Sequence, residues 1–218
     1  MFDAANARRL MVEGQVRTAD VSDTNLLDAM ATVPREKFLP PSLAPLAYLD
    51  NDIQIAKGRA LLRPMVLAKL IQAARLQAGD RVLDVACGTG YSSAVLARLA
   101  GSVVALEDDA DLARGAKEAL ASVGADAVEV MVGPLSAGWP AAGAYDVVLI
   151  NGSAEIVPDA FGGQLKPDGR LLAIFGRAPA TKGTIFHLVE GRLVGRPIFD
   201  GAARRLLPGF EAAQSFVF

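Results

Sequence analysis

The 218-residue sequence has little of the chemistry on which several protein classes depend. Cys87 is the only cysteine, which excludes an intramolecular disulfide, and His187 is the only histidine, which leaves no zinc site made of cysteine and histidine. The net charge of −2 gives no basic excess to attract nucleic acid or anionic lipid. No apolar run reaches the roughly 20 residues that span a bilayer, and the charged N-terminus lacks a signal peptide's apolar core. We therefore expect a cytoplasmic protein with no metal and no nucleic-acid or membrane partner.

Apolar residues are abundant, by contrast, and from Arg81 onward they follow an alternating pattern. Hydrophobic residues make up 52% of the chain and charged residues 21%, which is typical of a globular protein. Short apolar runs separated by helical patterns occur at RVLDVA, SVVALE, AVEVMV, YDVVLI and RLLAIF. Strands that alternate with helices are typical of βαβ units, so we expect a parallel sheet covered on both faces. After Phe175, TIFHLVEGRLVGRPIF predicts a hairpin and AAQSFVF one more strand.

Residues 1–63 differ from the rest of the chain. Apolar spacing predicts a helix over Ala7–Val16, and Ser22 suits the N-cap of a second helix. Residues 39–63 are rich in proline and show little periodicity, which predicts a long loop of the kind that serves as a lid or a binding segment. We therefore divide the chain into an N-terminal helical cap with a substrate loop, 1–63, and a Rossmann-like domain, 64–218.

A glycine turn lies where the first predicted strand of that domain meets a helix. Gly88 and Gly90 permit a tight turn and the close approach of a ligand at the carboxyl end of the strand, where open α/β sheets bind ligands. The dinucleotide pattern G-x-G-x-x-G is incomplete, because Ser93 occupies its third glycine position. An acidic residue before a glycine turn is instead the S-adenosylmethionine pattern, and Asp84 provides that residue. Its carboxylate would complement the ammonium group of that cofactor, directly or through water, and would repel a pyrophosphate.

A second carboxylate ends the next predicted strand. Glu107 could accept hydrogen bonds from both ribose hydroxyls, while Asp109, two residues on, suits the cap of the following helix. Two alternatives stay open. The acids could be solvated strand-end charges with glycines that serve only the turn, or the chain could be a nicotinamide-dependent oxidoreductase without the third glycine. The combination of both acids with the glycine turn favours S-adenosylmethionine.

Three segments resemble the protein-L-isoaspartate O-methyltransferases, over about residues 11–176: VLDVACGTGYSSAVLA, MVEGQVRTADVSDTNLLDAMATVPREKFLP and YDVVLINGSAEIVPDAFGGQLKPDGRLLAIFG. The resemblance implies an α/β, Rossmann-like class I methyltransferase. Its seven-stranded, mostly parallel sheet would have the order 3-2-1-4-5-7-6 and an N-terminal helical cap. It also implies S-adenosylmethionine-dependent methylation of isoaspartyl carboxylates in proteins or peptides, a repair reaction whose ester closes to a succinimide. A monomer and a dimer are both compatible with it.

The same resemblance implies the cofactor-binding residues, which are Asp84, Ala86, Cys87, Gly88, Gly90, Tyr91, Glu107, Asp108, Pro134 and Leu135. For Tyr91, a position at the methionine end of the cofactor and a packing role at the helix start are both open. The family usually has Gly-Asp-Gly after the third strand, where this chain has Gly133-Pro134-Leu135. The adenine is therefore expected to depend on backbone groups and apolar packing.

The substrate loop departs from the family pattern. The family reads Thr-Ile-Ser-Gln-Pro where this chain has Ala60-Leu61-Leu62-Arg63-Pro64, so Leu62 occupies the position of the family's catalytic serine and no catalytic residue can be assigned. Arg63 is a candidate for binding an acidic substrate group, with a surface role as the alternative. Asn151, after the fourth strand, is a second candidate substrate-binding residue. The altered loop leaves open a different or small acceptor, and a non-catalytic S-adenosylmethionine-binding protein.

Overall fold

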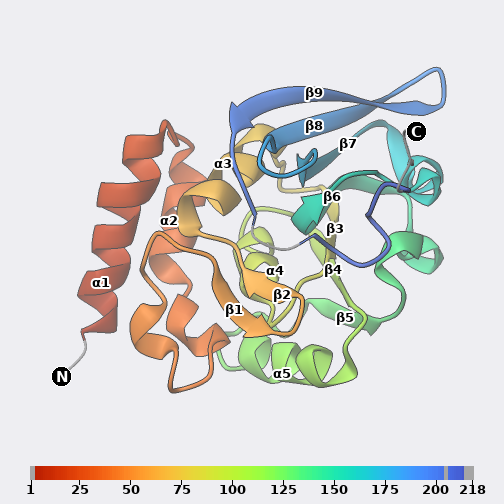
Figure 1. Ribbon diagram of the computed structural model, residues 1–218. Helices are drawn as coiled ribbons and strands as arrows, with labels where there is room; N and C mark the ends of the chain where they lie inside the picture. The colour runs from red at the N-terminus through yellow and green to blue at the C-terminus, as the bar shows by residue number, and fades with distance from the viewer. Residues whose placement is uncertain (1–2, 204–205, 214–218) are drawn as a thin grey trace.

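The computed structural model describes residues 3–203 and 206–213. Its centre is a seven-stranded sheet with the order β5-β4-β3-β6-β7-β8-β9 (Figure 1). Neighbours from β5 to β7 pair in parallel, whereas β8 and β9 are antiparallel. The strands are β3 (Arg81–Val85), β4 (Ser102–Glu107), β5 (Glu129–Val132), β6 (Tyr145–Ala154), β7 (Leu165–Phe175), β8 (Lys182–Val189) and β9 (Arg192–Asp200). All five predicted apolar runs are therefore strands of one sheet.

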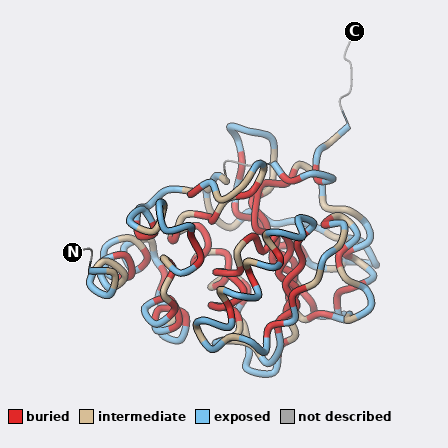
Figure 2. The backbone as a smooth tube through the Cα atoms, turned by 90° about the horizontal axis from the view of Figure 1, so that it is seen from below, coloured by how far each residue is buried: buried red, intermediate tan, exposed pale blue. Residues whose placement is uncertain are grey.

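The parallel strands are apolar on both faces because both faces are covered. Along β3, Val82 belongs to one buried cluster, while Leu83 and Val85 belong to another on the opposite side. Helices cover the first face, and short 3-10 turns with the segment around Phe210 cover the second. Figure 2 shows the buried residues concentrated along the central strands. The continuous apolar runs therefore follow from a sheet enclosed between two layers.

The order of the last two strands corrects the expectation. The first five strands have the predicted order 3-2-1-4-5, but β8 pairs with β7 and β9 pairs with β8, which gives 6-7 in place of 7-6. The cause is a two-residue turn at Glu190 and Gly191, whose φ angles of 50° and 78° suit a tight hairpin and keep β8 and β9 paired from Val189↔Arg192 onward. Of the strand predicted at AAQSFVF, residues 214–218 lie outside the described residues.

The helices are α1 (Ala4–Met11), α2 (Thr24–Thr32), α3 (Pro64–Ala74), α4 (Tyr91–Leu96) and α5 (Ala110–Ala121). A π-helical and a 3-10 turn continue α1 as far as Ala19. The N-cap of α2 is Asp23, which accepts a hydrogen bond from the Leu26 amide at 3.1 Å, and not the predicted Ser22, whose amide donates to Gln72 at 2.7 Å. Asp109 caps α5, as predicted, and Pro64 begins α3.

The helices before residue 64 bury their apolar faces against the rest of the chain. Val16, Leu26 and Met30 are fully buried in the same apolar cluster as Leu70 of α3 and Val95 of α4. In Figure 1, α1 and α2 stand at one side of the molecule, next to α3. The division of the chain at residue 63 stays a prediction.

Residues 39–63 contain more regular structure than their composition predicts. A 3-10 turn at Ala44–Leu46 is followed by a short antiparallel hairpin, β1 (Ile53–Ala56) and β2 (Arg59–Leu61). Strands of four and three residues are too short to show a period, which is why the sequence indicated only a loop. The hairpin contacts residues at the carboxyl ends of β3 and β4, where the site is built (Figure 1).

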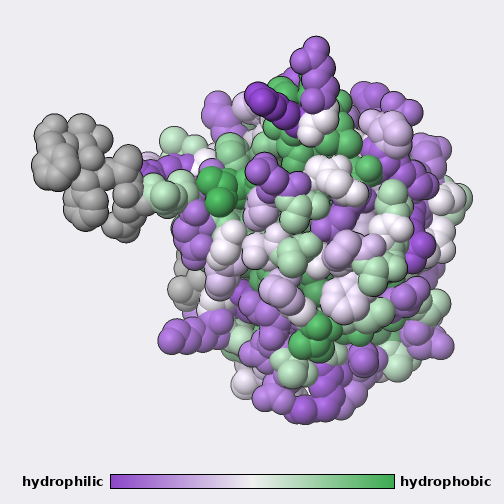
Figure 3. Space-filling view, turned by 90° about the vertical axis from the view of Figure 1, so that its right-hand side faces the viewer, coloured by the Kyte–Doolittle hydropathy of each residue, from purple (hydrophilic) through white to green (hydrophobic). Residues whose placement is uncertain are grey.

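The exposed surface is mixed. Large exposed apolar side chains of the described residues include Leu10, Leu49, Val132 and Val194, which lie on different elements. On the face drawn in Figure 3, apolar residues lie among polar ones. None of the described helices is both long and apolar enough to cross a membrane. Within the described ranges, no group of three or more His, Cys, Asp or Glu side chains could hold a metal ion.

Candidate active site

The glycine turn between β3 and α4 is compact and has a left-handed backbone. Ala86, Gly88 and Gly90 have φ angles of 59°, 57° and 91°. A Cβ on Gly90 would lie 3.2 Å from Leu120 Cγ, so the turn packs closely onto α5. Gly90 is the N-cap of α4, whose first amide groups face the turn. Glycine suits these positions for two reasons: the backbone is left-handed, and neighbouring side chains approach it closely.

Asp84 ends β3 as a fully buried carboxylate held by neutral donors. Its Oδ2 accepts hydrogen bonds from the hydroxyls of Ser92 at 2.7 Å and Ser93 at 2.6 Å, and its Oδ1 accepts one from the Asn151 amide. Burial raises the pKa of Asp84 to about 6, although these hydrogen bonds act in the opposite direction. A nearby cationic ligand group would lower the pKa of Asp84 again, because it favours the ionised carboxylate.

Glu107 ends β4, and it too is fully buried. Its Oε2 accepts the Gly88 amide at 2.9 Å, and its Oε1 accepts the Asp108 amide at 3.0 Å. Arg59 of the hairpin donates its Nε to the same Oε1 at 2.9 Å and also pairs with the Asp108 carboxylate. Burial raises the pKa of Glu107, and the charge of Arg59 opposes that rise. Glu107, the second carboxylate of the predicted pair, therefore forms an ion pair with Arg59 of the same chain.

A small cavity of about 10 Å³ lies beside the turn, which is room for about one water molecule. Asn151 and Ser92 line it, but Asp84 does not, so these two side chains separate Asp84 from the cavity. Leu62 also lines it and is 4% exposed. A ligand group in this space would meet Asn151 and Ser92 before it met Asp84.

Arg35 also lines this cavity. It is fully buried, and its Nε and Nη2 donate to the carbonyls of Ala47 at 2.8 Å and Leu62 at 2.7 Å. Its guanidinium carbon lies 4.6 Å from the centre of the Tyr91 ring, which also packs edge-on against Phe38. Arg35 Nη1 and Tyr91 Oη have no hydrogen-bond partner among the described residues. The Tyr91 ring therefore packs against Arg35 and Phe38 at the start of α4.

The remaining predicted site residues are spread around this centre. Arg63 is the N-cap of α3, and its amide donates to Asp52 at 2.8 Å while its Nε lies 3.7 Å from the same carboxylate. Cys87 is buried, which raises the pKa of its thiol. Leu135 is buried in the core on one face of the sheet, whereas Pro134 is exposed. Leu135 therefore belongs to the core on that face, and its proposed packing against the adenine stays a prediction.

Four contributors to the site were missed in the sequence. Ser92 and Ser93 support Asp84 from the first turn of α4, and Arg35 lies in the quoted segment VPREKFLP without a role having been assigned to it. Arg59 gave no signal, because its partner Glu107 is 48 residues away and the hairpin that carries it has no period.

With the geometry of the site established, we compared the chain with known proteins. Residues 6–185 match the family described as protein-L-isoaspartate(D-aspartate) O-methyltransferase. The chain belongs to this family. The isoaspartate O-methyltransferase of Methylorubrum extorquens is 42% identical over 174 residues, which are 80% of this chain and 76% of that protein. The enzyme of Methylorubrum populi is 41% identical over 81% of this chain and 82% of its own.

Solved structures agree with this family assignment. A protein-L-isoaspartate O-methyltransferase aligns with a TM-score of 0.78 and 25% identity, and the match covers 92% of this chain and 66% of that one. A Plasmodium falciparum protein named for the same activity, in complex with S-adenosyl-L-homocysteine, aligns with a TM-score of 0.77 and 19% identity over 90% and 96% of the two chains, which shows the fold. Membership in the isoaspartate O-methyltransferase family confirms the expected fold class, and with it a methyltransferase that uses S-adenosylmethionine.

The residues of this site fit the ammonium end of that cofactor. At the ribose end, Arg59 occupies part of the carboxylate that the ribose hydroxyls would use. The buried Asp84, with Asn151 and Ser92 in front of it, suits an ammonium group. Gly88 leaves space that only the Ile55 side chain enters, because a Cβ there would lie 2.6 Å from Ile55 Cδ1. Glu107 is the right group for ribose hydroxyls, but Arg59 shares it. Each cofactor-binding role assigned above stays a prediction.

Proposed function

We propose that this protein transfers the methyl group of S-adenosylmethionine to the free carboxylate of isoaspartyl residues in proteins or peptides. The observation that carries the proposal is the pair of buried carboxylates, Asp84 and Glu107, at the ends of neighbouring strands on either side of the glycine turn. Family membership supports the choice of acceptor.

Methyl transfer to a carboxylate depends on positioning more than on acid–base catalysis. The cofactor supplies a methyl group bound to a positively charged sulfur. A carboxylate acceptor is already a nucleophile at neutral pH, because its ordinary pKa is about 4, so no general base is required. The protein has to exclude water and hold the acceptor oxygen in line with the methyl group, at about 3 Å. A site without an assigned catalytic residue is compatible with that requirement.

The chain's own residues have distinct positions for this task. In the proposal, Glu107 accepts the ribose hydroxyls, and Asn151 and Ser92 receive the amino-acid end in front of Asp84. Asn151 also borders Leu62, so it is the candidate that faces the acceptor. Arg63 is held near Asp52, and it would bind an acidic group of the substrate only by giving up that contact.

A second candidate function is methylation of a different acceptor by the same fold. It is favoured by Leu62, an apolar and buried side chain at the position of the family's serine. A leucine cannot donate a hydrogen bond to a carboxylate, and the loss of such a donor changes the discrimination between substrates strongly.

The test is methyl transfer from labelled S-adenosylmethionine to an isoaspartyl peptide, with the normal aspartyl peptide of the same sequence as control. We expect label in the isoaspartyl peptide alone, as a base-labile ester that releases methanol. The doubly neutralised variant Asp84→Asn/Glu107→Gln should transfer at least about a hundredfold less, since it removes two charge-assisted contacts. Label in both peptides, or in neither, contradicts the proposal. Transfer to another acceptor alone would establish the second candidate.

A further inference from the structure

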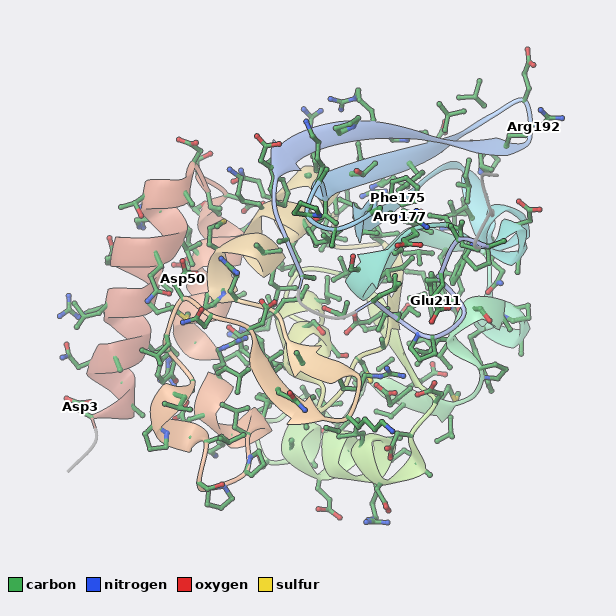
Figure 4. The ribbon with its side chains drawn as sticks, in the orientation of Figure 1. Asp3, Asp50, Phe175, Arg177, Arg192 and Glu211 are labelled. Atoms are coloured by element: carbon green, nitrogen blue, oxygen red, sulfur yellow. The ribbon has the colours of Figure 1, made fainter. Side chains whose placement is uncertain are left out.

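The β1–β2 hairpin covers the glycine turn and is pinned there by one side chain. Ile55 of β1 fills the space above Gly88, where an added Cβ would lie 2.6 Å from Ile55 Cδ1. From β2, Arg59 reaches the buried end of β4 and is itself only 5% exposed. Figure 4 draws the side chains of this region, where Asp50 and Glu211 are labelled to either side of the hairpin in the view. The hairpin therefore lies on the surface that a cofactor must reach.

Arg59 uses hydrogen-bonding capacity of Glu107 that the ribose needs. Oε1 accepts Arg59 Nε at 2.9 Å, the Asp108 amide at 3.0 Å and, at a longer 3.4 Å, the Asp109 amide, so no lone pair of this oxygen is left for another donor. Oε2 accepts the Gly88 amide at 2.9 Å and keeps one free position. Two ribose hydroxyls require two acceptor positions, so they and Arg59 cannot all be bound to Glu107 at once.

We infer that Arg59 is a determinant of cofactor affinity: its ion pair with Glu107 is a latch that the ribose must displace, together with the hairpin, for S-adenosylmethionine to bind. The inference rests on the proposed function, because it takes Glu107 to be the ribose acceptor. When the latch opens, the guanidinium keeps a partner in Asp108, which it already contacts at the rim of the site. The exchange replaces one set of hydrogen bonds to a buried carboxylate by another, so both states are accessible to a folded protein.

Binding of S-adenosyl-L-homocysteine, the demethylated product, tests the latch without any need for turnover. Calorimetry measures this binding directly. The fluorescence of Trp139, the only tryptophan of the sequence, provides a second signal, because its ring packs on the residue that follows β5: a Cβ added to Gly133 would lie 3.0 Å from Trp139 Cζ3. We expect Arg59→Gln to bind about tenfold more tightly and to associate faster than the wild type, since one charge-assisted contact no longer competes. The titration is run at pH 8, because burial raises the pKa of Glu107 and a higher pH favours its ionised form.

A matched control removes the same charge at the exposed turn of the same hairpin. Lys57→Gln should leave affinity and association rate unchanged, because Lys57 is exposed and lies two residues from Arg59. Arg59→Lys keeps the charge without the planar fork, so we expect an intermediate affinity. It also provides a variant to test if Arg59→Gln does not fold.

A second measurement follows the hairpin in the cofactor-free protein. Cleavage after Lys57 by a lysine-specific protease should be several times faster in Arg59→Gln than in the wild type, because the hairpin is no longer pinned. Equal or weaker binding of the product by a folded Arg59→Gln, or cleavage at the wild-type rate, would overturn the latch alone. Absence of binding by both proteins would overturn the proposed function, and the latch with it.

Discussion

At the scale of single residues, burial sets the chemistry of the two acids. Asp84 and Glu107 are both fully buried, yet they are stabilised differently: hydroxyls and an amide surround Asp84, whereas an arginine pairs with Glu107. A carboxylate that is buried among neutral donors keeps its proton to a higher pH. A bound ammonium group would oppose this effect and lower the pKa of Asp84.

The raised pKa of Asp84 predicts how stability depends on pH. The folded pKa is about 6 and the ordinary value is 3.8, so the folded state retains a proton that the unfolded chain has released. The stabilising contribution is complete below pH 4 and is lost as the pH rises through 6, by about 3 kcal/mol at 1.36 kcal/mol per unit. Urea unfolding of Asp84→Asn between pH 4 and 7 should lack this decline.

The control for that experiment is Asp126→Asn, at an exposed position, which should keep the wild-type pH profile. An Asp84→Asn profile parallel to the wild type would show that Asp84 is ionised throughout this range, contrary to the prediction.

At the scale of elements, the segment before α3 is organised by one buried cation. Arg35 follows α2 and joins the carbonyl of Ala47 to that of Leu62, so it fixes the start and the end of the segment that carries the hairpin. Burial lowers the pKa of Arg35. A charge in this position is tolerated because its fork meets two carbonyl oxygens that would otherwise be unsatisfied.

We predict that Arg35→Lys destabilises the protein by about 2–3 kcal/mol, because one ammonium group cannot bridge both carbonyls and leaves a buried acceptor unpaired. Arg9→Lys is the matched control: Arg9 is exposed and its side chain donates to Asn6 within α1, so its replacement should change stability by less than about 0.5 kcal/mol. Urea unfolding measures both variants. A loss for Arg35→Lys as small as that of the control would rule out a bridging role.

At the scale of the whole molecule, the carboxyl ends of β3, β4 and β6 bring distant residues into one place. Asn151 meets Asp84 across 67 positions of the sequence, and Arg59 meets Glu107 across 48. Because such a site exists only in the folded chain, a ligand that binds there stabilises the entire fold.

We therefore predict that S-adenosyl-L-homocysteine raises the melting temperature of the protein. At one hundred times the dissociation constant the gain is about 2.7 kcal/mol, which is several degrees for a chain of this size. The variant Asp84→Asn/Glu107→Gln should show no such rise at the same ligand concentration. An equal rise in the variant would mean that the ligand binds away from these two carboxylates.

The local patterns of the sequence were sufficient for the parallel strands and for much of the site. The runs RVLDVA and SVVALE predicted β3 and β4, and the glycines after Val85 predicted the turn, because a two-sided apolar strand and a left-handed turn each leave a local signature. Asp109 was predicted as a cap for the same reason. Ser22 was assigned as the cap of α2 in place of Asp23, a shift of one residue between two good capping side chains.

What the sequence determined by itself is therefore local, namely the five strands from β3 to β7 and the glycine turn with its two acids, whereas the strand order and the family were implied by the resemblance. Only the tertiary structure decided that β8 lies beside β7, that Asn151 and two serines enclose Asp84, and that Arg59 holds Glu107. The physical reason is that strand and turn patterns arise from neighbours along the chain. Long-range pairs depend on which surfaces are buried together, and no spacing in the sequence records that choice.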